Sequence, residues 1–387
     1  MKYFWAVAKN ELLDIFWRDR RRAVLLLLAS VAYLLLFSWL YLFGVVREIP
    51  LLVVDQSNTA LSRRLAQNFD DSDGFRVVAW ADSDEGVAYW LRSQGRHSAA
   101  LVIPPDFAEK IQRGRQSEVL LAVDGSNIIV TSNSSIAAID LMQKFNAECA
   151  AELLQRDARQ LRQQSARRVE PVAFTYRILG NPQLDYLRFF VYGLALVALQ
   201  QGLLLAVAAG VLWEGGAAAG AVPRPWTAWL AKSAVYVFLG LVSYVLFLAA
   251  GQRLFALPVA GAWWQHLLLA GAFLFCVTQV GGIAACLAGD ELLFSRLSIF
   301  YTVPAFMLSG YTWPLEAMPW GVRCLAYLSP FTYFAQAARG LCLNGHYYAL
   351  YSNTAVLLCA GTLALPIAVW LYGGQVRQNM FIKKILR

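Results

Sequence analysis

Charged side chains in an otherwise apolar stretch, residues 306–345, are the residues of this chain best placed to do chemistry. Glu316, Arg323 and Arg339 would be costly at membrane depth unless Glu316 pairs with one arginine or a wet cavity receives them. Glycines and prolines also interrupt this stretch, and irregular backbone is tolerated inside a membrane only where protein or water covers it. We therefore predict that residues 310–345 form a re-entrant element beside a transport route. The alternative is that the three charges lie in water at the level of the lipid headgroups.

Three glutamines form a second set of polar groups within apolar segments. Gln200, Gln201 and Gln279 are candidates for residues that line the substrate pathway. The alternative is that they make hydrogen bonds between helices, which contribute well under ~2 kcal/mol each. The sequence leaves both interpretations open.

Motifs of common catalytic and cofactor sites are absent from the sequence. It contains no G-x-x-x-x-G-K-[ST] phosphate loop, no Gly-Lys dipeptide, no H-E-x-x-H and no serine in a nucleophile elbow. The six cysteines form no C-x-x-C pair, and a disulfide between Cys324 and Cys342 is only weakly indicated. We therefore predict that the chain is not an enzyme and has no catalytic, cofactor-binding or metal-binding residues.

The composition is that of an integral membrane protein. Of the 387 residues, 58% are hydrophobic and 15% are charged, whereas soluble domains are roughly 45–50% apolar and 25% charged. The net charge of +8 is typical of basic segments that flank membrane spans. The lipid bilayer is therefore an expected partner, and nucleic acid is not.

The predicted topology begins with an amphipathic helix that lies on the membrane surface, residues 1–22. A first span, residues 23–46, follows several arginines, and the positive-inside rule places that end in the cytoplasm. Five further spans lie within the membrane domain, residues 186–387, whose basic C-terminus is also expected in the cytoplasm. This topology places residues 310–345 on the outside. The later spans are predicted at residues 187–213, 228–251, 263–288, 297–309 and 353–373.

Residues 47–185 are more polar and alternate between strand and helix signals, which indicates a compact α/β domain. Because the first span runs outward, this domain is expected outside the cytoplasm. The fold class is thus a polytopic α-helical membrane protein with six transmembrane helices, an outer re-entrant helical hairpin and an inserted extracytoplasmic α/β domain. Strands are expected at residues 49–54, 75–80, 99–103 and 117–123, helices at 61–68, 84–93 and 106–113, and a helical stalk at 134–164.

Two inner connections carry charged residues that a soluble partner could contact. Glu214, Gly215 and Gly216 end the predicted second span, where glycine stops the helix or a short docking helix begins. Asp290 and Glu291 lie in the predicted turn before the fifth span, where a solvated surface pair is the simpler interpretation.

The order of these elements resembles the membrane subunits of ABC transporters of the ABC-2 type, especially those with a large outer domain between the first two spans. The resemblance covers nearly the whole chain. Its motifs are IPLLVVDQSN (49–58) with LSRRL (61–65), AALVIPPDF (99–107), GRQSEVLLAVDGSN (114–127), RILGNPQLD (177–185) and LSGYTWPLEAMPWGVRCLAYLSP (308–330). The last of these is similar to the outer re-entrant signature of the family. From this resemblance, the residues expected to form an outer gate are Gly310, Pro314, Glu316, Pro319, Arg323, Pro330 and Arg339.

The resemblance implies the permease subunit of an exporter in the bacterial inner membrane, with a drug, lipid, peptide or glycan as its substrate. Two protomers, identical or related, would pair above cytoplasmic ABC ATPase subunits, which would bind ATP and Mg in place of this chain. A periplasmic adaptor and an outer-membrane channel are further partners that it suggests. The residues expected to contact the ATPase are Phe4, Glu11, Trp17, Glu214, Gly215, Gly216, Arg224, Asp290 and Glu291.

One motif departs from the family pattern. The family usually has a charged Arg-Glu-Arg/Lys-Glu-x-Gly-Thr sequence after the second span, where this chain reads LWEGGA (212–217). We therefore hypothesise that this protomer is the weaker-coupled half of a heterodimer. The main alternative to an exporter is an envelope assembly protein whose outer domain binds a partner without transport. An ion-coupled carrier ranks last, because neither internal repeats nor charges in the middle of spans are found.

Overall fold

The computed structural model describes the chain except for residues 43–45, 94–97, 114, 124–127, 157–184, 218–223 and 386–387. It divides into two compact units, Met1–Gly44 with Ile178–Arg387, and Val45–Arg177. We call them the membrane unit and the α/β unit. Each unit has a hydrophobic core of its own.

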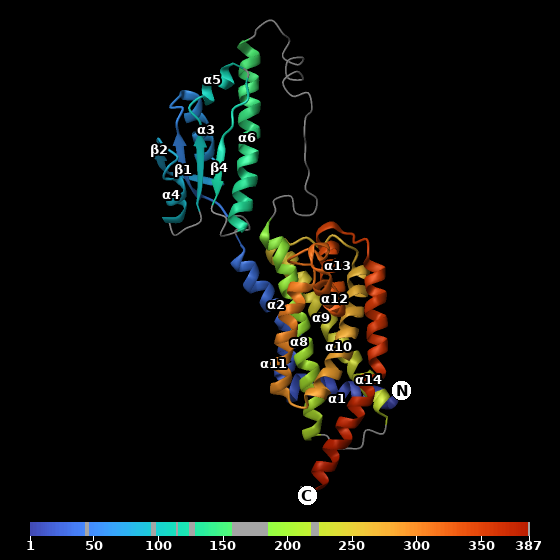
Figure 1. Cartoon of the computed structure of the whole chain (residues 1–387). Coiled ribbons are helices and arrows are strands. Elements are labelled where there is room, and N and C mark those ends of the chain that lie inside the picture. Colours follow the sequence, from blue (N-terminus) through green and yellow to red (C-terminus); the bar gives the residue numbers. More distant parts are fainter. Residues whose placement is uncertain are drawn as a thin grey trace. The chain divides into compact units, whose positions relative to one another are not determined.

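Six helices of the described residues are long and apolar enough to cross a membrane, and all belong to the membrane unit (Figure 1). The number agrees with the predicted number of spans. The helices are α2 (Arg20–Leu40), α8 (Tyr186–Ala217), α9 (Pro225–Phe255), α10 (Trp263–Ala288), α11 (Glu291–Leu308) and α14 (Leu350–Ile385).

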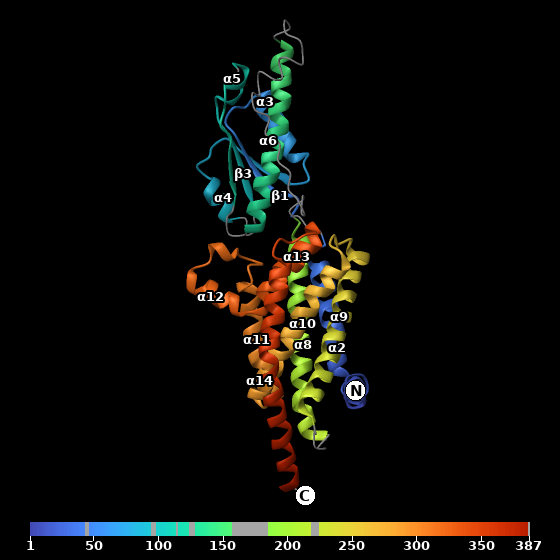
Figure 2. The same cartoon turned by 90° about the vertical axis from the view of Figure 1, so that its right-hand side faces the viewer.

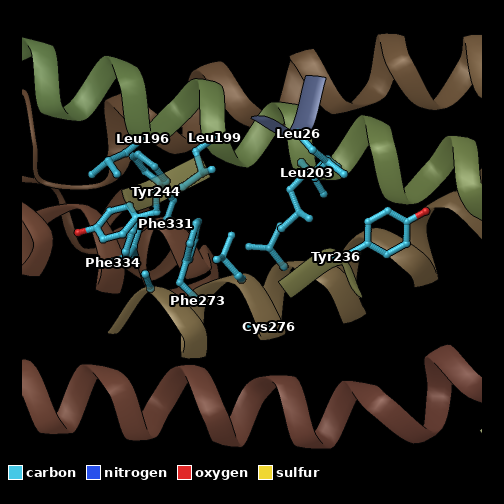
Figure 3. Close-up of a cluster of buried hydrophobic side chains, with 14 of the residues drawn as sticks. Leu26, Leu196, Leu199, Leu203, Tyr236, Tyr244, Phe273, Cys276, Phe331 and Phe334 are labelled. Atoms are coloured by element: carbon cyan, nitrogen blue, oxygen red, sulfur yellow. The ribbon is translucent and has the colours of Figure 1, made fainter. Parts of the chain in front are cut away.

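The core of the membrane unit is built from large apolar and aromatic side chains of several helices. Figure 3 shows Phe273 of α10 and Phe334 packed together, and their rings stack with centroids 4.0 Å apart. Helix α8 is the most buried of the six and packs against α2, α10 and α11. Gly202 permits this packing, because a Cβ at that position would lie 2.2 Å from the carbonyl oxygen of Leu25 in α2.

Several span boundaries differ from the prediction, most of all at the first and fifth spans. The first span begins at Arg20, so Arg22 belongs to the helix rather than to a basic segment before it. The fifth span begins at Glu291, because the side chain of Asp290 caps the helix by accepting from the Leu293 amide at 2.8 Å. The second span, Tyr186–Leu212, agrees with the predicted bounds, and α8 ends at Ala217, directly after Gly215 and Gly216.

The N-terminal segment is helical but is not one straight helix. Helix α1 (Lys2–Leu13) runs into a π-helical turn, η1 (Asp14–Arg18). Asp19 then leaves the helical region with φ −130° and ψ 78°, and α2 starts at the next residue. The break at Asp19 allows α1 and α2 to run in different directions.

The segment predicted to be re-entrant contains two helices with different surroundings. After a 3-10 turn, η2 (Leu315–Ala317), come α12 (Trp320–Leu328) and α13 (Pro330–Asn344). Helix α13 is packed among α8, α10 and α14, whereas α12 projects beside α11 and is largely exposed (Figure 2). The predicted break before Pro330 is confirmed, since Ser329 is extended and the proline opens α13. A return into the membrane is not established by this arrangement.

The α/β unit contains a four-stranded sheet in the order β2-β1-β3-β4. Strand β1 is parallel to both β2 and β3, and β4 is antiparallel to β3. The two inner strands are almost wholly buried, which explains their continuous apolar sequences. The strands are β1 (Ile49–Asp55), β2 (Phe75–Ala81), β3 (Ala99–Ile103) and β4 (Leu120–Val123).

Helices cover both faces of this sheet. Helices α3 (Ala60–Asp70), α5 (Phe107–Gln112) and α6 (Ile128–Arg156) pack on one face, and α4 (Val87–Ser93) packs on the other. The predicted stalk helix therefore starts earlier than residue 134 and belongs to the core of the unit. Its predicted end, residues 157–164, lies outside the described residues.

Candidate functional site

Four charged or polar side chains meet in the interior of the membrane unit, where α1, α2 and α9 come together. They are Glu11 of α1, Arg22 of α2, and Lys232 and Tyr236 of α9, and each is at most 3% exposed. We call these four residues the charge cluster. Side chains of Glu, Arg and Lys are almost never buried so completely unless they are paired.

The Glu11 carboxylate is the centre of the charge cluster, because the other three side chains all contact it. Lys232 Nζ lies 2.5 Å from Glu11 Oε2, and Arg22 Nη1 lies 2.9 Å from Glu11 Oε1. The Tyr236 hydroxyl donates to the same Oε1 at 2.6 Å. In Figure 3 the hydroxyl of Tyr236 points away from the other labelled rings. One carboxylate thus fixes α1 to two spans.

Residue spacing brings these groups together. Glu11 lies three residues after Ala8 and four before Ile15, so all three share the buried face of the N-terminal segment. Lys232 and Tyr236 lie four residues apart on α9 and therefore point to the same side.

A glycine of a fourth helix completes the site. A Cβ on Gly210 of α8 would lie 1.9 Å from Tyr236 Oη and 3.0 Å from both Arg22 Nη1 and Glu11 Oε1. Any other residue at this position would displace the charge cluster or α8. The polar groups are therefore enclosed by α1, α2, α8 and α9.

Among the described residues, the charges of the site are balanced. Arg22 and Lys232 contribute two positive charges, and Glu11 and the 5% exposed Asp19 contribute two negative charges. Arg22 Nε lies 3.5 Å from Asp19 Oδ2. Burial by itself raises the pKa of the Glu11 carboxyl, but Lys232 and Arg22 outweigh burial and hold the pKa below its ordinary value of 4.5. Glu11 is therefore ionised at neutral pH.

Ionic contacts continue from the charge cluster to the surface. Asp19 Oδ1 accepts from Arg21 Nε at 2.9 Å, and Arg21 Nη1 lies 3.9 Å from Glu291 Oε1 at the start of α11. Two residues of the predicted ATPase surface, Glu11 and Glu291, therefore belong to one network. The exposed outer contact to Glu291 contributes little to stability.

Of the other residues predicted for the ATPase surface, those whose side chains are described lie outside this network. Phe4 is half-buried against the core, Trp17 is 72% exposed, and Arg224 is exposed at the N-cap of α9. Asp290 caps α11. Glu214, Gly215 and Gly216 lie in the last turn of α8, and their side chains fall outside the described residues.

Arg339 is the best-defined of the residues predicted for the outer gate. Its guanidinium lies 4.3 Å from the ring centroid of Tyr311 and 4.8 Å from that of Phe189, and it donates to the Tyr311 carbonyl at 3.1 Å. The Tyr311 hydroxyl donates to the Phe189 carbonyl at 2.5 Å and accepts from the Gly193 amide at 3.0 Å. These contacts join α13, the loop after α11 and the start of α8.

The expected ion pair between Glu316 and an arginine does not form among the described residues. Glu316 is exposed and Arg323 is half-buried, while Arg339 is neutralised by no carboxylate and stacks on aromatic rings instead. Glu316 is exposed and therefore needs no buried partner. Arg339 is half-buried, and the alternative that all three charges lie in water stays a prediction.

The glycine and prolines of the predicted gate set the path of the backbone. Gly310 has φ +77°, and a Cβ there would lie 1.9 Å from Gln336 Nε2. Pro314 precedes η2, Pro319 precedes α12 and Pro330 begins α13. These residues separate three short elements and leave little freedom at Gly310.

Two of the three pathway glutamines form hydrogen bonds between helices. Gln201 donates to Ser298 Oγ at 2.8 Å and accepts from Thr302 Oγ1 at 2.6 Å, which links α8 to α11. Gln279 accepts from the Trp229 indole at 2.6 Å, which links α10 to α9. Gln200 is fully buried, and neither of its side-chain polar atoms has a partner.

The cysteine side chains form no disulfide among the described residues. All six cysteines are free, with Cys324 exposed and Cys342 buried, so no disulfide joins these two. No group of three or more potential ligands occurs within the described part of the chain.

Sequence reasoning named Glu11 but missed Arg22, Lys232, Tyr236 and Gly210. Lys232 was the available signal, because a lysine eight residues into an apolar span is costly unless an acid neutralises it. The pairing of Glu11 with Lys232 could not be predicted from the sequence, because the two residues lie far apart along the chain.

Together, the six membrane-length helices, the inserted α/β unit and an N-terminal helix ion-paired to the spans define a polytopic membrane protein. The chain belongs to the ABC-2 family of transporters, because the family model described as "ABC-2 family transporter protein" matches residues 22–371.

Curated relatives agree with this family. The chain is 25% identical over 359 residues to the probable multidrug ABC transporter permease YbhR of Escherichia coli, which covers 88% of this chain and 89% of that protein. It is 20% identical over 284 residues to the probable multidrug ABC transporter permease YbhS (72% of each chain), and 24% identical over 313 residues to the inner membrane transport permease YhhJ (76% and 77%) of the same organism. No solved structure matches the chain.

Proposed function

We propose that this chain is the permease subunit of an ABC exporter that moves its substrate out across the bacterial inner membrane. The chain belongs to a transporter family, and the main observation that supports this function is the charge cluster. It fixes the amphipathic α1 to α2 and α9 through Glu11. A helix held in this way can pass a displacement to two spans at once. Both termini are proposed to lie in the cytoplasm, as the basic flanks predict.

ATP hydrolysis is assigned to a separate cytoplasmic ATPase, which binds the ATP and Mg. The exposed surface of α1 and of the following turn η1, which includes Trp17, provides its proposed contact together with Glu291 at the start of α11. Buried Glu11 acts through the position of α1 and not by touching the ATPase. Closure of the ATPase then moves α1, and the charge cluster transmits the movement to α2 and α9.

The proposed assembly contains two permease protomers, of which this chain is one. Its reduced charge at residues 212–217 suggests the weaker-coupled half of a heterodimer. The α/β unit is the proposed contact for a periplasmic adaptor that leads to an outer-membrane channel. Residues 310–345 are the proposed re-entrant outer gate, with Arg339 as the contact that holds it closed.

Export of drug-like compounds is the proposed activity, because the relatives YbhR and YbhS are each named a probable multidrug permease. Lipids, peptides and glycans are the other substrate classes to be tested.

Reconstitution with the ATPase tests the function. We expect the chain to co-purify with an ABC ATPase and, with a partner permease, to export a fluorescent drug in an ATP-dependent manner. Robust ATP turnover by a homodimer would rule out the heterodimer hypothesis alone. Failure to bind any ATPase would overturn the exporter and favour an envelope assembly protein.

A further inference from the structure

A recess opens on the surface of the membrane unit where α9 begins, α10 ends and α14 passes both. Its cavity volume is about 550 Å³, which is typical of sites for small ligands. Its lining includes Trp226 of α9, Cys286 of α10 and Trp370 of α14. Neither the charge cluster nor the predicted pathway residues line it.

The recess exists because α14 lacks side chains where it faces α9. Gly373 approaches Pro225, with a Cβ position 3.4 Å from the proline Cβ. At the neighbouring Gly374, a Cβ would meet no atom within 4 Å. Trp229 is turned inward and packs on Tyr372, so it does not fill the space. The opening is therefore a feature of the packing of three helices.

Most residues that line the recess are aromatic or apolar, and the recess opens to the outside of the membrane unit. Trp226 is 50% exposed and Trp370 is 76% exposed. Polar side-chain atoms are provided by Gln375, Cys286 and the indole N–H groups of the two tryptophans. An alkyl chain in the recess could contact both indole rings. Tryptophans at such positions are typical of the membrane–water interface.

A positively charged residue, Arg224, lies next to the recess. Arg224 is exposed, directly precedes the lining residues Pro225 and Trp226, and forms no recorded ion pair among the described residues. The start of α9 adds the positive end of a 31-residue helix. A recess with two exposed indole rings, beside an exposed arginine, matches the two parts of an anionic lipid.

We propose that this recess binds an anionic membrane phospholipid, with one acyl chain against Trp226 and Trp370 and the phosphate at Arg224. The lipid is a resident ligand and not the exported cargo. It links α9, which carries two members of the charge cluster, to α14, and this role does not depend on the proposed export.

Photolabelling of the purified full chain tests the site without any ATPase. The chain is placed in phosphatidylethanolamine nanodiscs that contain a phosphatidylglycerol with a photoreactive group in its acyl chain. We expect peptides around Cys286 and Gly374 to be labelled more than the exposed face of α11 that carries Phe300. Adding a phosphatidylglycerol without the reactive group should protect Cys286 from a maleimide.

Matched variants make the test specific. Gly374→Leu fills the recess without a clash and should reduce its labelling by about tenfold. Gly271→Leu adds the same side chain in open space on α10, outside the recess, and should change nothing. Arg224→Gln should abolish the preference for phosphatidylglycerol over phosphatidylcholine and leave labelling by the chain intact.

Each of the following outcomes would overturn the proposal. Equal labelling of α11 and the recess would mean that the lipid is only part of the surrounding bilayer. Unchanged labelling in Gly374→Leu, or equal loss in Gly271→Leu, would show that the label does not report the recess. Equal binding of both lipids by the unsubstituted chain would refute the anionic headgroup. Protection of Cys286 by a transported drug, but not by lipid, would assign the recess to the substrate.

Discussion

Glu11 is the residue that the other three members of the charge cluster all contact, so its loss would remove the anion that Arg22 and Lys232 share. Its carboxylate contacts Lys232, Arg22 and Tyr236, and all four side chains are buried. A buried ion pair adds little relative to apolar packing, but removal of one partner is strongly destabilising. The value of the charge cluster therefore lies in fixing one arrangement of α1, α2 and α9.

Replacement of Glu11 by glutamine should lower the free energy of unfolding by about 3–5 kcal/mol, because two cations lose their shared anion. Combining Glu11→Gln with Lys232→Met should recover part of this loss, with a coupling energy of about 1–3 kcal/mol. Thermal unfolding of the four chains measures it. The matched control is Lys9→Gln on the exposed face of α1, for which a change within about 0.5 kcal/mol is expected. Additive effects of the two substitutions would contradict the shared site.

The same carboxylate predicts how stability depends on pH. The pKa of Glu11 is held below 4.5 in the folded chain, so the unfolded chain binds more protons between the two pKa values. Its stabilising contribution is therefore complete above about pH 4.5 and is lost as the pH falls through the folded pKa. We expect the melting temperatures of the unsubstituted chain and Glu11→Gln to converge below pH 4.5 and to stay a constant distance apart between neutral pH and that point. Convergence near neutral pH would contradict an ionised Glu11.

At the scale of elements, Arg339 holds α13 to the loop after α11 and to α8. Arg339→Gln removes two cation–π contacts, each about 0.5–2 kcal/mol, and should destabilise the chain by about 1–3 kcal/mol. Arg339→Lys keeps the charge but not the planar group, so it should restore only part of the stability. Glu316→Gln, which changes an exposed residue of the same segment, is the control and should have almost no effect.

A transport assay distinguishes a gating role of Arg339 from a role in packing alone. If residues 310–345 act as a gate, Arg339→Gln should raise substrate leak in the absence of ATP, measured in vesicles that retain a stable protein. A loss of stability with unchanged leak would leave Arg339 as a structural residue only.

The packing of α8 on α2 depends on Gly202. Gly202→Ala places a methyl group 2.2 Å from the Leu25 carbonyl oxygen, so we expect a loss of about 1–3 kcal/mol in thermal unfolding. Gly271→Ala on α10 meets no atom within 4 Å and should be neutral or stabilising by up to about 1 kcal/mol. Equal behaviour of the two alanines would show that α8 and α2 are not closely packed at Gly202.

At the scale of the whole molecule, the proposed topology places Cys324 outside and both termini inside. Cys324 is exposed on α12. A membrane-impermeant maleimide should therefore label it in intact spheroplasts, and Cys324→Ser should abolish that label. Labelling only after the membrane is opened would reverse the orientation.

The α/β unit should fold without the membrane unit. Its sheet is covered by α3, α5 and α6 on one face and by α4 on the other, with cores that include no residue of the spans. We expect residues 45–177 to be soluble and to unfold cooperatively in a circular dichroism melt. A broad, non-cooperative transition would show that the spans are required for its folding.

The sequence alone determined the number of spans and the presence of the α/β domain, because apolar length and strand alternation are local properties of the chain. It also predicted the break before Pro330 and the family. Span boundaries were less accurate, because polar residues such as Glu291 and Arg20 look like flanking residues, whereas α11 begins at Glu291 after the Asp290 cap and α2 begins at Arg20.

Only the tertiary structure decided which charged residues meet. Glu11 and Lys232 are separated by 221 positions, and each alone resembles a surface or flanking charge. Arg339 likewise stacks on the rings of Phe189 and Tyr311 and does not pair with the expected carboxylate. Local sequence fixes the hydrophobic pattern of each helix, but the pairing of polar groups depends on which helix faces are brought together, and that is a property of the folded chain.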